Sequence, residues 1–289
     1  MTQRRRAIGI VLAVWVAPLL MAGRAVAAEK KSEEQPVCYV RFEVGDRVAY
    51  GIVEGEGVRE LRGDLFGSWR PTDKIHELAE VKLLVPTRPS KVLAVAGNYR
   101  SHLADQPVHG NPEFFFKVPS CLIANGEEIV LPEGSAPVHY EGELVIVIGK
   151  RAKNVPEDRA LECVLGVTCG NDISARDWQQ NDVQWWRAKA SDTFGPCGPL
   201  ICSGIDYDDL LLQLRLNGQV KQRQRTSDMV HGVAALVSFA SRYVTLEPGD
   251  LIYTGTPGQT TEIKPGDVLE VELEGVGILR NPVAGAGSP

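Results

Sequence analysis

The spacing of apolar and polar residues changes character near residue 86. Before it, short alternating segments such as VCYVRF and RVAYGIV lie between glycine-rich turns, the pattern of half-buried strands. This pattern predicts a small β-rich N-terminal domain over residues 37–85. A helix is expected within it at residues 71–79, because Thr72 and Asp73 can cap a helix. The proline-punctuated stretch VPTRPS then predicts a joint to a second domain over residues 86–285.

Strands dominate the pattern of the second domain. Apolar runs bounded by turn residues predict strands at KVLAVAG, LVIVIGK, VLGVTCG, PLICSG, LLLQLRLNG, DLIYTGT and VLEVELEGVG. A helix is predicted over residues 227–242, where apolar residues recur at helical spacing and Ser227 or Asp228 can cap the first turn. A shorter helix is predicted over residues 156–165. Many strands with few helices predict a mixed, β-rich α/β fold with a curled or barrel-like sheet.

The N-terminus has the layout of an export signal. The charged segment MTQRRR precedes an apolar run of 17 residues and the small-residue site RAVAA. We therefore predict a cleavable signal peptide over residues 1–27, a polar tether over residues 28–36, and a periplasmic location. An uncleaved anchor is the alternative, and it would be the only expected membrane contact. The pair Arg5-Arg6 also fits a twin-arginine signal.

Charge and cysteine content narrow the class of partner. The net charge is −6, although the first 27 residues carry four arginines and no acid, so the remainder is more acidic still. An acidic body argues against nucleic acid as a partner, because phosphate binding needs a basic surface.

The six cysteines show no zinc-binding spacing, and we interpret them as small buried hydrophobic residues. An exported protein can form a disulfide, but the sequence does not identify a pair.

A pair of glutamates begins one of the predicted strands. Glu141 and Glu143 point to one face because strand side chains alternate, and Val145 and Val147 continue that face as core. Two like charges side by side require a raised pKa or a bound cation, unless the strand end is solvated. Asp172 follows another apolar run and offers a third carboxylate. Three carboxylates suit a hard cation, Mg²⁺, Mn²⁺ or Ca²⁺.

Other candidate residues lie where strands end. His102 and Asp105 follow KVLAVAG three residues apart, so a helical turn would make them a histidine–carboxylate base. Lys189 lies in a glycine- and proline-rich loop where it could balance a bound anion. Thr256 ends an apolar strand, a usual place for ligand contacts. The alternative for each is an ordinary surface polar residue.

The order of these segments resembles the fumarylacetoacetate hydrolase (FAH) family. The phrases that carry the resemblance run in one order from residue 86 to 283 and include PSKVLAVAGNYRSHLAD, HYEGELVIVIGKRAKNV, GVTCGNDISARDWQ and MVHGVAALVSFASRYVTLEPGDLIYTGTPG. The resemblance implies a rolled β-sheet catalytic domain, a homodimer and a Mg²⁺ or Mn²⁺ site. It implies metal ligands at Glu141, Glu143 and Asp172. It further implies a lid histidine at His102 and substrate contacts at Lys189, Gln179, Thr256 and Arg176, the last of which can be structural as well.

The chain departs from the family pattern at three places. Relatives often carry glutamate where this chain has Asp105, and the shorter side chain would hold His102 and a water less firmly. The segment TGTPGQTTE replaces a Gly-Val-Gly run that many relatives have after the proline, which changes a loop at the rim of the site. A signal peptide is also unusual, because most relatives are intracellular.

The resemblance implies enzymatic cleavage of a carbon–carbon bond in a small anionic 2,4-dioxo acid, of the acylpyruvate or fumarylacetoacetate type. In this hypothesis His102, steadied by Asp105, activates water, Lys189 balances the substrate's charge, and the metal stabilises the departing enolate. The same site also supports isomerisation of 2-hydroxy-diene-dioates or decarboxylation of oxaloacetate, and the shorter Asp105 favours these non-hydrolytic outcomes. A further alternative is an exported metal-holding protein without turnover.

Overall fold

The computed structural model describes residues 36–103, 106–108 and 110–287. The predicted signal peptide, all of the tether except Pro36, and Asp105 lie outside the described residues. In the described part, no helix combines the length and the apolar character that crossing a membrane requires.

The described residues form a β-rich chain with few helices. The strands are β1 (Val37–Val44), β2 (Arg47–Glu54), β3 (Gly57–Gly63), β4 (Trp69–Glu77), β5 (Lys82–Leu83), β6 (Val92–Ala96), β7 (Glu113–Lys117), β8 (Leu122–Ile123), β9 (Ile129–Leu131), β10 (Val138–His139), β11 (Gly142–Ile148), β12 (Val164–Asn171), β13 (Ser174–Ala175), β14 (Gly195–Ser203), β15 (Leu211–Leu216), β16 (Gln219–Arg225), β17 (Leu251–Tyr253), β18 (Val268–Leu273) and β19 (Gly277–Gly285). The α-helices are α1 (Arg100–Leu103), α2 (Arg176–Asn181), α3 (Trp186–Ala190) and α4 (Val233–Tyr243), and short 3₁₀ helices span Leu78–Glu80, Pro119–Cys121, Glu157–Cys163 and Thr226–Asp228.

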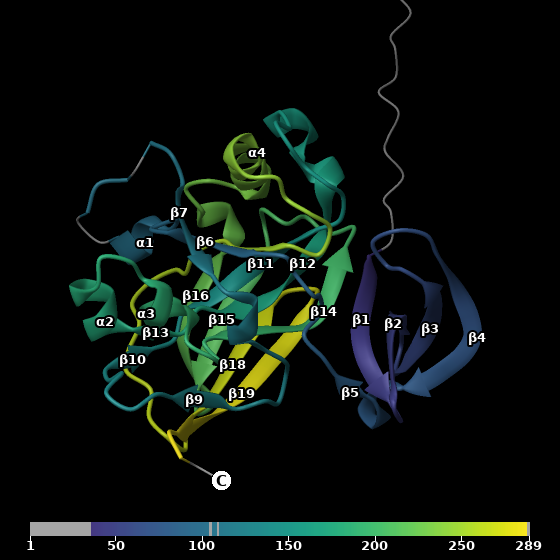
Figure 1. Cartoon of the computed structure of the whole chain (residues 1–289), viewed down its shortest axis with the longest axis horizontal. Helices are drawn as coiled ribbons and strands as arrows, with labels where there is room; N and C mark the ends of the chain where they lie inside the picture. Colours follow the sequence, from purple (N-terminus) through teal and green to yellow (C-terminus); the bar gives the residue numbers. More distant parts are fainter. Residues whose placement is uncertain (1–35, 104–105, 109, 288–289) are drawn as a thin grey trace, which may run out of the picture. The chain divides into compact units, whose positions relative to one another are not determined.

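One long sheet joins the N-terminal strands to those of the second domain. Its order is β4-β3-β2-β1-β14-β12-β11-β17-β6-β7, with β5 on β1 and β8 on β14. The order runs from one edge strand to another, so this sheet is open rather than a closed barrel. A second sheet has the order β16-β15-β18-β19-β9 (Figure 1). The predicted β-rich mixed fold is confirmed.

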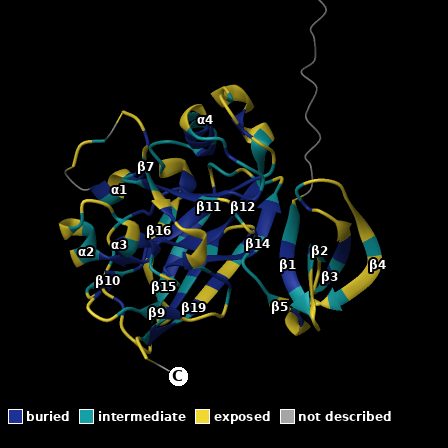
Figure 2. Cartoon of the chain, viewed as in Figure 1, coloured by how far each residue is buried: buried dark blue, intermediate teal, exposed yellow. Residues whose placement is uncertain are grey.

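Strand β11 separates two apolar clusters. Every residue of β11 is buried (Figure 2). Leu144 and Ile146 belong to the larger cluster, which also includes the inner faces of the second sheet and α4. Val145 and Val147 point to the opposite face, into a second cluster. The alternation expected from the sequence therefore holds, and the face of Val145 and Val147 continues towards Glu141 and Glu143.

The helix predicted over residues 71–79 is wrong. Strand β4 occupies most of this range and pairs with β3 in antiparallel register. Thr72 does not cap a helix: its hydroxyl donates to the carbonyl oxygen of Glu60 on the neighbouring strand at 2.9 Å. A hydroxyl that can cap a helix can equally bond a backbone carbonyl of a neighbouring strand. The local sequence does not show that such a strand lies beside Thr72.

The second predicted helix begins later than its sequence suggests. Helix α4 starts at Val233, and the earlier residues form a 3₁₀ turn and an extended link. The amides of Val230 and His231 donate to the backbone and side-chain oxygens of Asn98 at 2.8 Å, which holds the link out of helical geometry. The amide of Val233 is capped by Asp208 at 3.0 Å instead of by Ser227 or Asp228. The short helix expected at residues 156–165 is present as the 3₁₀ helix Glu157–Cys163.

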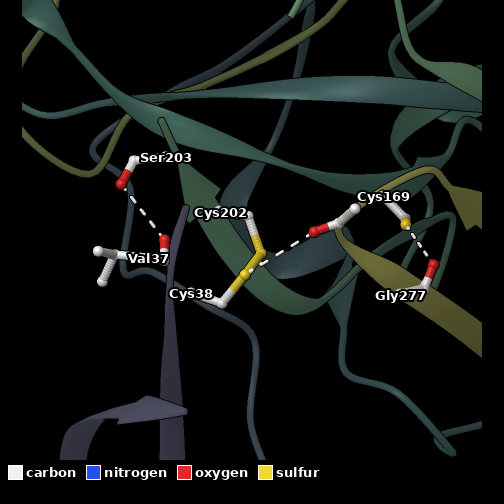
Figure 3. The surroundings of a disulfide bond; sticks show 7 residues. Val37, Cys38, Cys169, Cys202, Ser203 and Gly277 are labelled. Atoms are coloured by element: carbon white, nitrogen blue, oxygen red, sulfur yellow. Dashed lines mark hydrogen bonds between the residues drawn. A yellow bond between two sulfur atoms is a disulfide. The ribbon is translucent and has the colours of Figure 1, made fainter. Parts of the chain in front are cut away.

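A disulfide fastens the N-terminal strands to the second domain. Cys38 on β1 lies directly opposite Cys202 on β14, and the two are bonded (Figure 3). The interpretation of all six cysteines as hydrophobic residues is therefore wrong for this pair. It agrees with the structure for the free, buried residues Cys121, Cys169 and Cys197.

Candidate metal centre and active site

Two antiparallel strands bring the predicted carboxylates together. β11 and β12 pair with Gly142 opposite Asn171, and Glu141 and Asp172 lie just beyond this pair. The amide of Asp172 donates to the carbonyl oxygen of Glu141 at 2.8 Å, and the amide of Glu141 donates to Asn171 Oδ1 at 2.9 Å. Carboxylate oxygens of Glu141, Glu143 and Asp172 all lie within 4.8 Å of one another.

Burial makes this cluster electrostatically costly. Glu141, Glu143 and Asp172 are 5%, 1% and 1% exposed, which excludes a solvated strand end. Burial raises the pKa of Glu143 well above its usual value, and the charges of Asp172 and Glu141 add to the rise. Burial also acts to raise the pKa of Glu141, but the charges of Lys189 and Arg176 hold that pKa well below its usual value. The cluster therefore favours cations at close range.

Two buried lysines supply part of this positive charge. Lys189 on α3 donates to Glu141 Oε2 at 2.6 Å and to Asp172 Oδ2 at 2.7 Å. Burial acts to lower the pKa of Lys189, but the charges of Asp172 and Glu141 raise it above its usual value. Lys117, at the end of β7, donates to Asp172 Oδ1 at 2.5 Å and to the carbonyl oxygens of Lys189 and Phe194. Asp172 is thus held from both sides.

Arg176 occupies the other side of Glu141. It begins α2, directly after strand β13, and its Nη2 donates to Glu141 Oε1 at 2.6 Å and to Thr260 Oγ1 at 2.8 Å. Its Nη1 donates to Gln179 Oε1 at 2.8 Å, one turn along the helix. The structure therefore brings Arg176 and Gln179 to the cluster together, with Arg176 orienting both Glu141 and Gln179.

The donor set fits a hard divalent cation. Carboxylate oxygens are the ligands that Mg²⁺ and Mn²⁺ prefer, and Glu141, Glu143 and Asp172 offer one each. Every carboxylate oxygen carries two lone-pair positions, so its hydrogen bond to a lysine, arginine or amide leaves room for a metal. Glu143 Oε2, for example, accepts from the amide of Gly255 at 2.7 Å.

His102 lies beside this cluster. It is on the four-residue helix α1, and its Nδ1 is 2.6 Å from the carbonyl oxygen of Gly258. A carbonyl oxygen can only accept, so Nδ1 carries a proton, and Nε2 is the ring nitrogen that remains for proton exchange. The predicted pairing of His102 with Asp105 stays a prediction, because Asp105 lies outside the described residues.

Two cavities with lining residues in common lie at the site. The inner one has a volume of about 60 Å³ and is lined by His102, Glu141, Arg176, Gln179, Lys189 and Thr256, among others. The outer one has a volume of about 490 Å³ and shares His102 and Arg176 with the inner one. His139 lines this outer recess and bonds Thr260 through Nδ1 at 2.9 Å. His139 therefore belongs to the polar rim, in keeping with its place at a strand mouth.

Thr256 is held rigidly at the inner wall. Its hydroxyl donates to the carbonyl oxygen of Gly142 at 2.9 Å and accepts from Gln222 Nε2 at 2.8 Å. Gln222 also donates to the carbonyl oxygen of Pro257 at 2.6 Å and accepts from the amide of Gly142 at 3.0 Å. Because the hydroxyl proton is already used, Thr256 can only accept from a bound molecule.

Sequence reasoning missed three residues that shape the site. In the sequence, Lys117 is only a single cation at the end of the aromatic run FFFK. No local pattern shows that this lysine is buried to 2% exposure. Gln222 lies in the polar strand β16 and gives no local signal. Asn98 donates to the carbonyl oxygens of Thr254 and His231, tying the loop of His102 to β17 and α4, which no local pattern shows.

A rolled sheet with a buried three-carboxylate cluster, two lysines and a histidine-lined cavity defines the class of protein. The chain belongs to the fumarylacetoacetate hydrolase family: residues 91–284 match the family described as fumarylacetoacetate (FAA) hydrolase C-terminal. Residues 39–86 match a second family, described as Rv2993c-like, N-terminal.

Several proteins resemble this chain over most of its length. Protein Rv2993c of Mycobacterium tuberculosis is 43% identical over 256 residues, which cover 84% of this chain and 97% of that protein. Oxaloacetate tautomerase fahd2, mitochondrial, of Xenopus laevis is 39% identical over 220 residues, covering 71% and 69%. The crystal structure of 2-hydroxyhepta-2,4-diene-1,7-dioate isomerase from Mycobacterium marinum matches with a TM-score of 0.82 and 42% identity, covering 87% of this chain and all of that one.

Proposed function

We propose that this protein is a metal-dependent enzyme that isomerises small 2-oxo acids by moving a proton at the carbon next to the oxo group. The observation that carries the proposal is the shared inner cavity, which places His102 with Glu141 of the buried carboxylate cluster and with Lys189. Relatives named as an isomerase and a tautomerase support the same type of reaction.

Glu141, Glu143 and Asp172 would hold Mg²⁺ or Mn²⁺. When bound, the ion would supply a Lewis acid that stabilises negative charge developing on the 2-oxo oxygen. Lys189 would add positive charge near the substrate carboxylate, because its ammonium group lies beside two of the three ligands. Lys117 would hold Asp172 in place, since its side chain is 0% exposed and its ammonium group pairs with that carboxylate.

His102 would move the proton. In the keto-to-enol direction, neutral Nε2 would take a proton from the carbon next to the oxo group. The electron pair of that C–H bond would form the carbon–carbon double bond of the enol, and the π pair of the oxo group would move to its oxygen. The resulting imidazolium would return a proton to that oxygen, which leaves the histidine neutral again. The hydrogen bond from Nδ1 to Gly258 holds the ring in the tautomer that this exchange requires.

The outer recess favours a substrate with a polar distal group. Its lining includes His139, Arg176 and Gln180, and burial, followed by the charge of Arg176, lowers the pKa of His139. A neutral histidine and a glutamine can donate hydrogen bonds, whereas the charge of Arg176 is already paired with Glu141 and Asp177 adds an acid to the lining. We therefore propose an uncharged oxygen group that accepts hydrogen bonds at the far end of the substrate.

Hydrolytic cleavage of a 2,4-dioxo acid is the second candidate. The position of His102 in the lining of both cavities favours it, because its Nε2, when neutral, can also activate water. Hydrolysis also requires a group that places this water. The predicted placing group is Asp105, while proton transfer needs only the groups already described around the inner cavity.

The test compares both reactions in one preparation. After removal of metal with EDTA and reloading with Mg²⁺, ketonisation of enol-oxaloacetate is followed by loss of enol absorbance, and acetylpyruvate cleavage by pyruvate release. We expect ketonisation that depends on Mg²⁺ and is abolished in Glu141→Ala and His102→Gln. His231→Gln is the matched control, because His231 lines neither cavity. Full ketonisation activity in Glu141→Ala would refute the proposal, and pyruvate release without ketonisation would favour the hydrolase.

We also propose export of the protein to an oxidising compartment. The disulfide between Cys38 and Cys202 supports this proposal, because structural disulfides persist mainly outside the reducing cytosol. Fractionation of cells, with detection of the mature N-terminus, tests it. Recovery of the full-length chain in the cytosol alone would contradict it.

A further inference from the structure

A larger cavity lies on the N-terminal strands, apart from the carboxylate cluster. It has a volume of about 820 Å³ and is formed by β1 to β4, the joint after β5 and the turn at Pro248 and Gly249. We call it the arginine cleft, after the residues Arg41, Arg47, Arg62 and Arg88 that line it. None of its lining residues lines the inner cavity or the outer recess.

Arg41 is the buried cation of this cleft. It lies on β1 directly opposite Tyr50 of β2 and is only 8% exposed. Its one side-chain hydrogen bond to another described residue goes from Nη1 to the carbonyl oxygen of Val85 at 3.2 Å. No described carboxylate lies within ion-pair distance of it. Arg41 lines the cleft, and its guanidinium donors that have no protein partner are not among the fully buried atoms, so they are open to an anion in the cleft.

The cleft carries an excess of positive charge. Its lining includes five cationic side chains, the four arginines and Lys74, against the three acids Glu60, Asp64 and Asp73. Glu60 is engaged by Arg47 through both carboxylate oxygens, at 2.5 and 2.6 Å. Asp64 accepts from the amide of Phe66 at 3.0 Å. Arg62 and Arg88, like Arg41, form no ion pair with another described residue, and the surplus stands out on a chain of net charge −6.

An aromatic wall completes the cleft. Tyr50 is half-buried, and its ring meets that of Phe66 edge to face at a centroid distance of 6.1 Å. Tyr50 lines the cleft together with Arg41 and Arg88, and burial raises the pKa of Tyr50 while the charges of these two arginines act against the rise. The phenol hydroxyl has no hydrogen-bond partner among the described residues. Two arginines, a tyrosine hydroxyl and the aromatic ring of Phe66 thus line one cavity.

We propose that the arginine cleft binds a small multivalent oxyanion, a dicarboxylate or a phosphate, between Arg41 and Arg88. Guanidinium groups match the geometry of both kinds of oxyanion through paired N–H donors. The hydroxyl of Tyr50 donates a further hydrogen bond, and the ring of Phe66 covers the carbon or ester part of the ligand. The site is separate from the proposed chemistry and does not rest on it.

Calorimetric titration of the mature protein with inorganic phosphate and, separately, with succinate tests the proposal at low ionic strength. Arg88→Ala removes an exposed cation of the cleft and keeps the fold, because Arg88 makes no hydrogen bond to another described residue. We expect binding of at least one anion, weakened about tenfold or more in Arg88→Ala, as for loss of a charged hydrogen bond. Arg70→Ala is the matched control, an exposed arginine on β4 that does not line the cleft.

The variant Glu141→Ala distinguishes anion binding in the arginine cleft from anion binding at the candidate active site, because it changes only the active site. Retained affinity in this variant and in Arg70→Ala, with loss in Arg88→Ala, supports the proposal. Binding of phosphate alone or of succinate alone also supports it and identifies the ligand class. Three results would overturn it: no binding of either anion by the unaltered protein, equal loss in Arg70→Ala and Arg88→Ala, or loss in Glu141→Ala alone.

Discussion

Removal of the disulfide between Cys38 and Cys202 should destabilise the protein strongly. The two cysteines are 164 positions apart, so the bond closes a very long loop in the unfolded chain. In the chain-entropy treatment, a loop of this length lowers the entropy of the unfolded state by roughly 17 cal/mol/K, or about 5 kcal/mol at 25 °C. Strands β1 and β14 are also held together by backbone pairing, so we expect the effect to fall mainly on the unfolded state.

The assay is urea unfolding of the double variant Cys38→Ala/Cys202→Ala beside the oxidised, unaltered protein. We expect the free energy of unfolding to fall by about 5 kcal/mol. Cys163→Ala is the control, because Cys163 is free and half-buried, and it should change stability by less than about 1 kcal/mol.

A thiol count in denaturant should give four free cysteines in the unaltered protein. If the count is four and the double variant is as stable as the unaltered protein, the entropic reasoning is refuted. A count of six would instead show that the bond does not form.

Three further changes probe charge and packing. Lys117→Met leaves Asp172 without one of its buried partners, so the free energy of unfolding measured with EDTA present should fall by about 3–5 kcal/mol. Added Mg²⁺ should restore part of the lost stability. Gly170→Ala places a methyl group against two core side chains, the nearer at 2.3 Å, and should lower the free energy of unfolding by about 1–3 kcal/mol or more in urea. The hydrogen bond from Arg47 lowers the pKa of Glu60 to about 2, so this carboxylate stabilises the fold above its unfolded pKa. That stabilisation should be lost as the pH falls towards 2, and Glu60→Gln should flatten acid unfolding in this range.

Much of the candidate site could be predicted from strand alternation alone. Side chains on a strand alternate whatever surrounds it, so the common face of Glu141, Glu143, Val145 and Val147 followed from their spacing. Asp172 could be added because it also follows an apolar run. That spacing could not show whether the glutamates were solvated, because burial depends on what packs against the strand.

The partners of these carboxylates came from distant parts of the chain. Lys117 is 55 positions from Asp172, and Gln222 is 80 positions from Gly142, so neither contact has a local signature. Tertiary contacts also overrode local propensity. Thr72 bonds a neighbouring strand, and Asn98 holds the residues before α4 in an extended link.

The sequence by itself determined the β-rich class, most strand positions and the three carboxylates, because periodicity and turn residues act over a few positions. Only the tertiary structure decided which cations balance those carboxylates, which two cysteines meet, and that Arg41 is buried without a carboxylate. Each of these depends on segments far apart in the chain meeting in space. Their electrostatic consequences follow from burial, which no local pattern specifies.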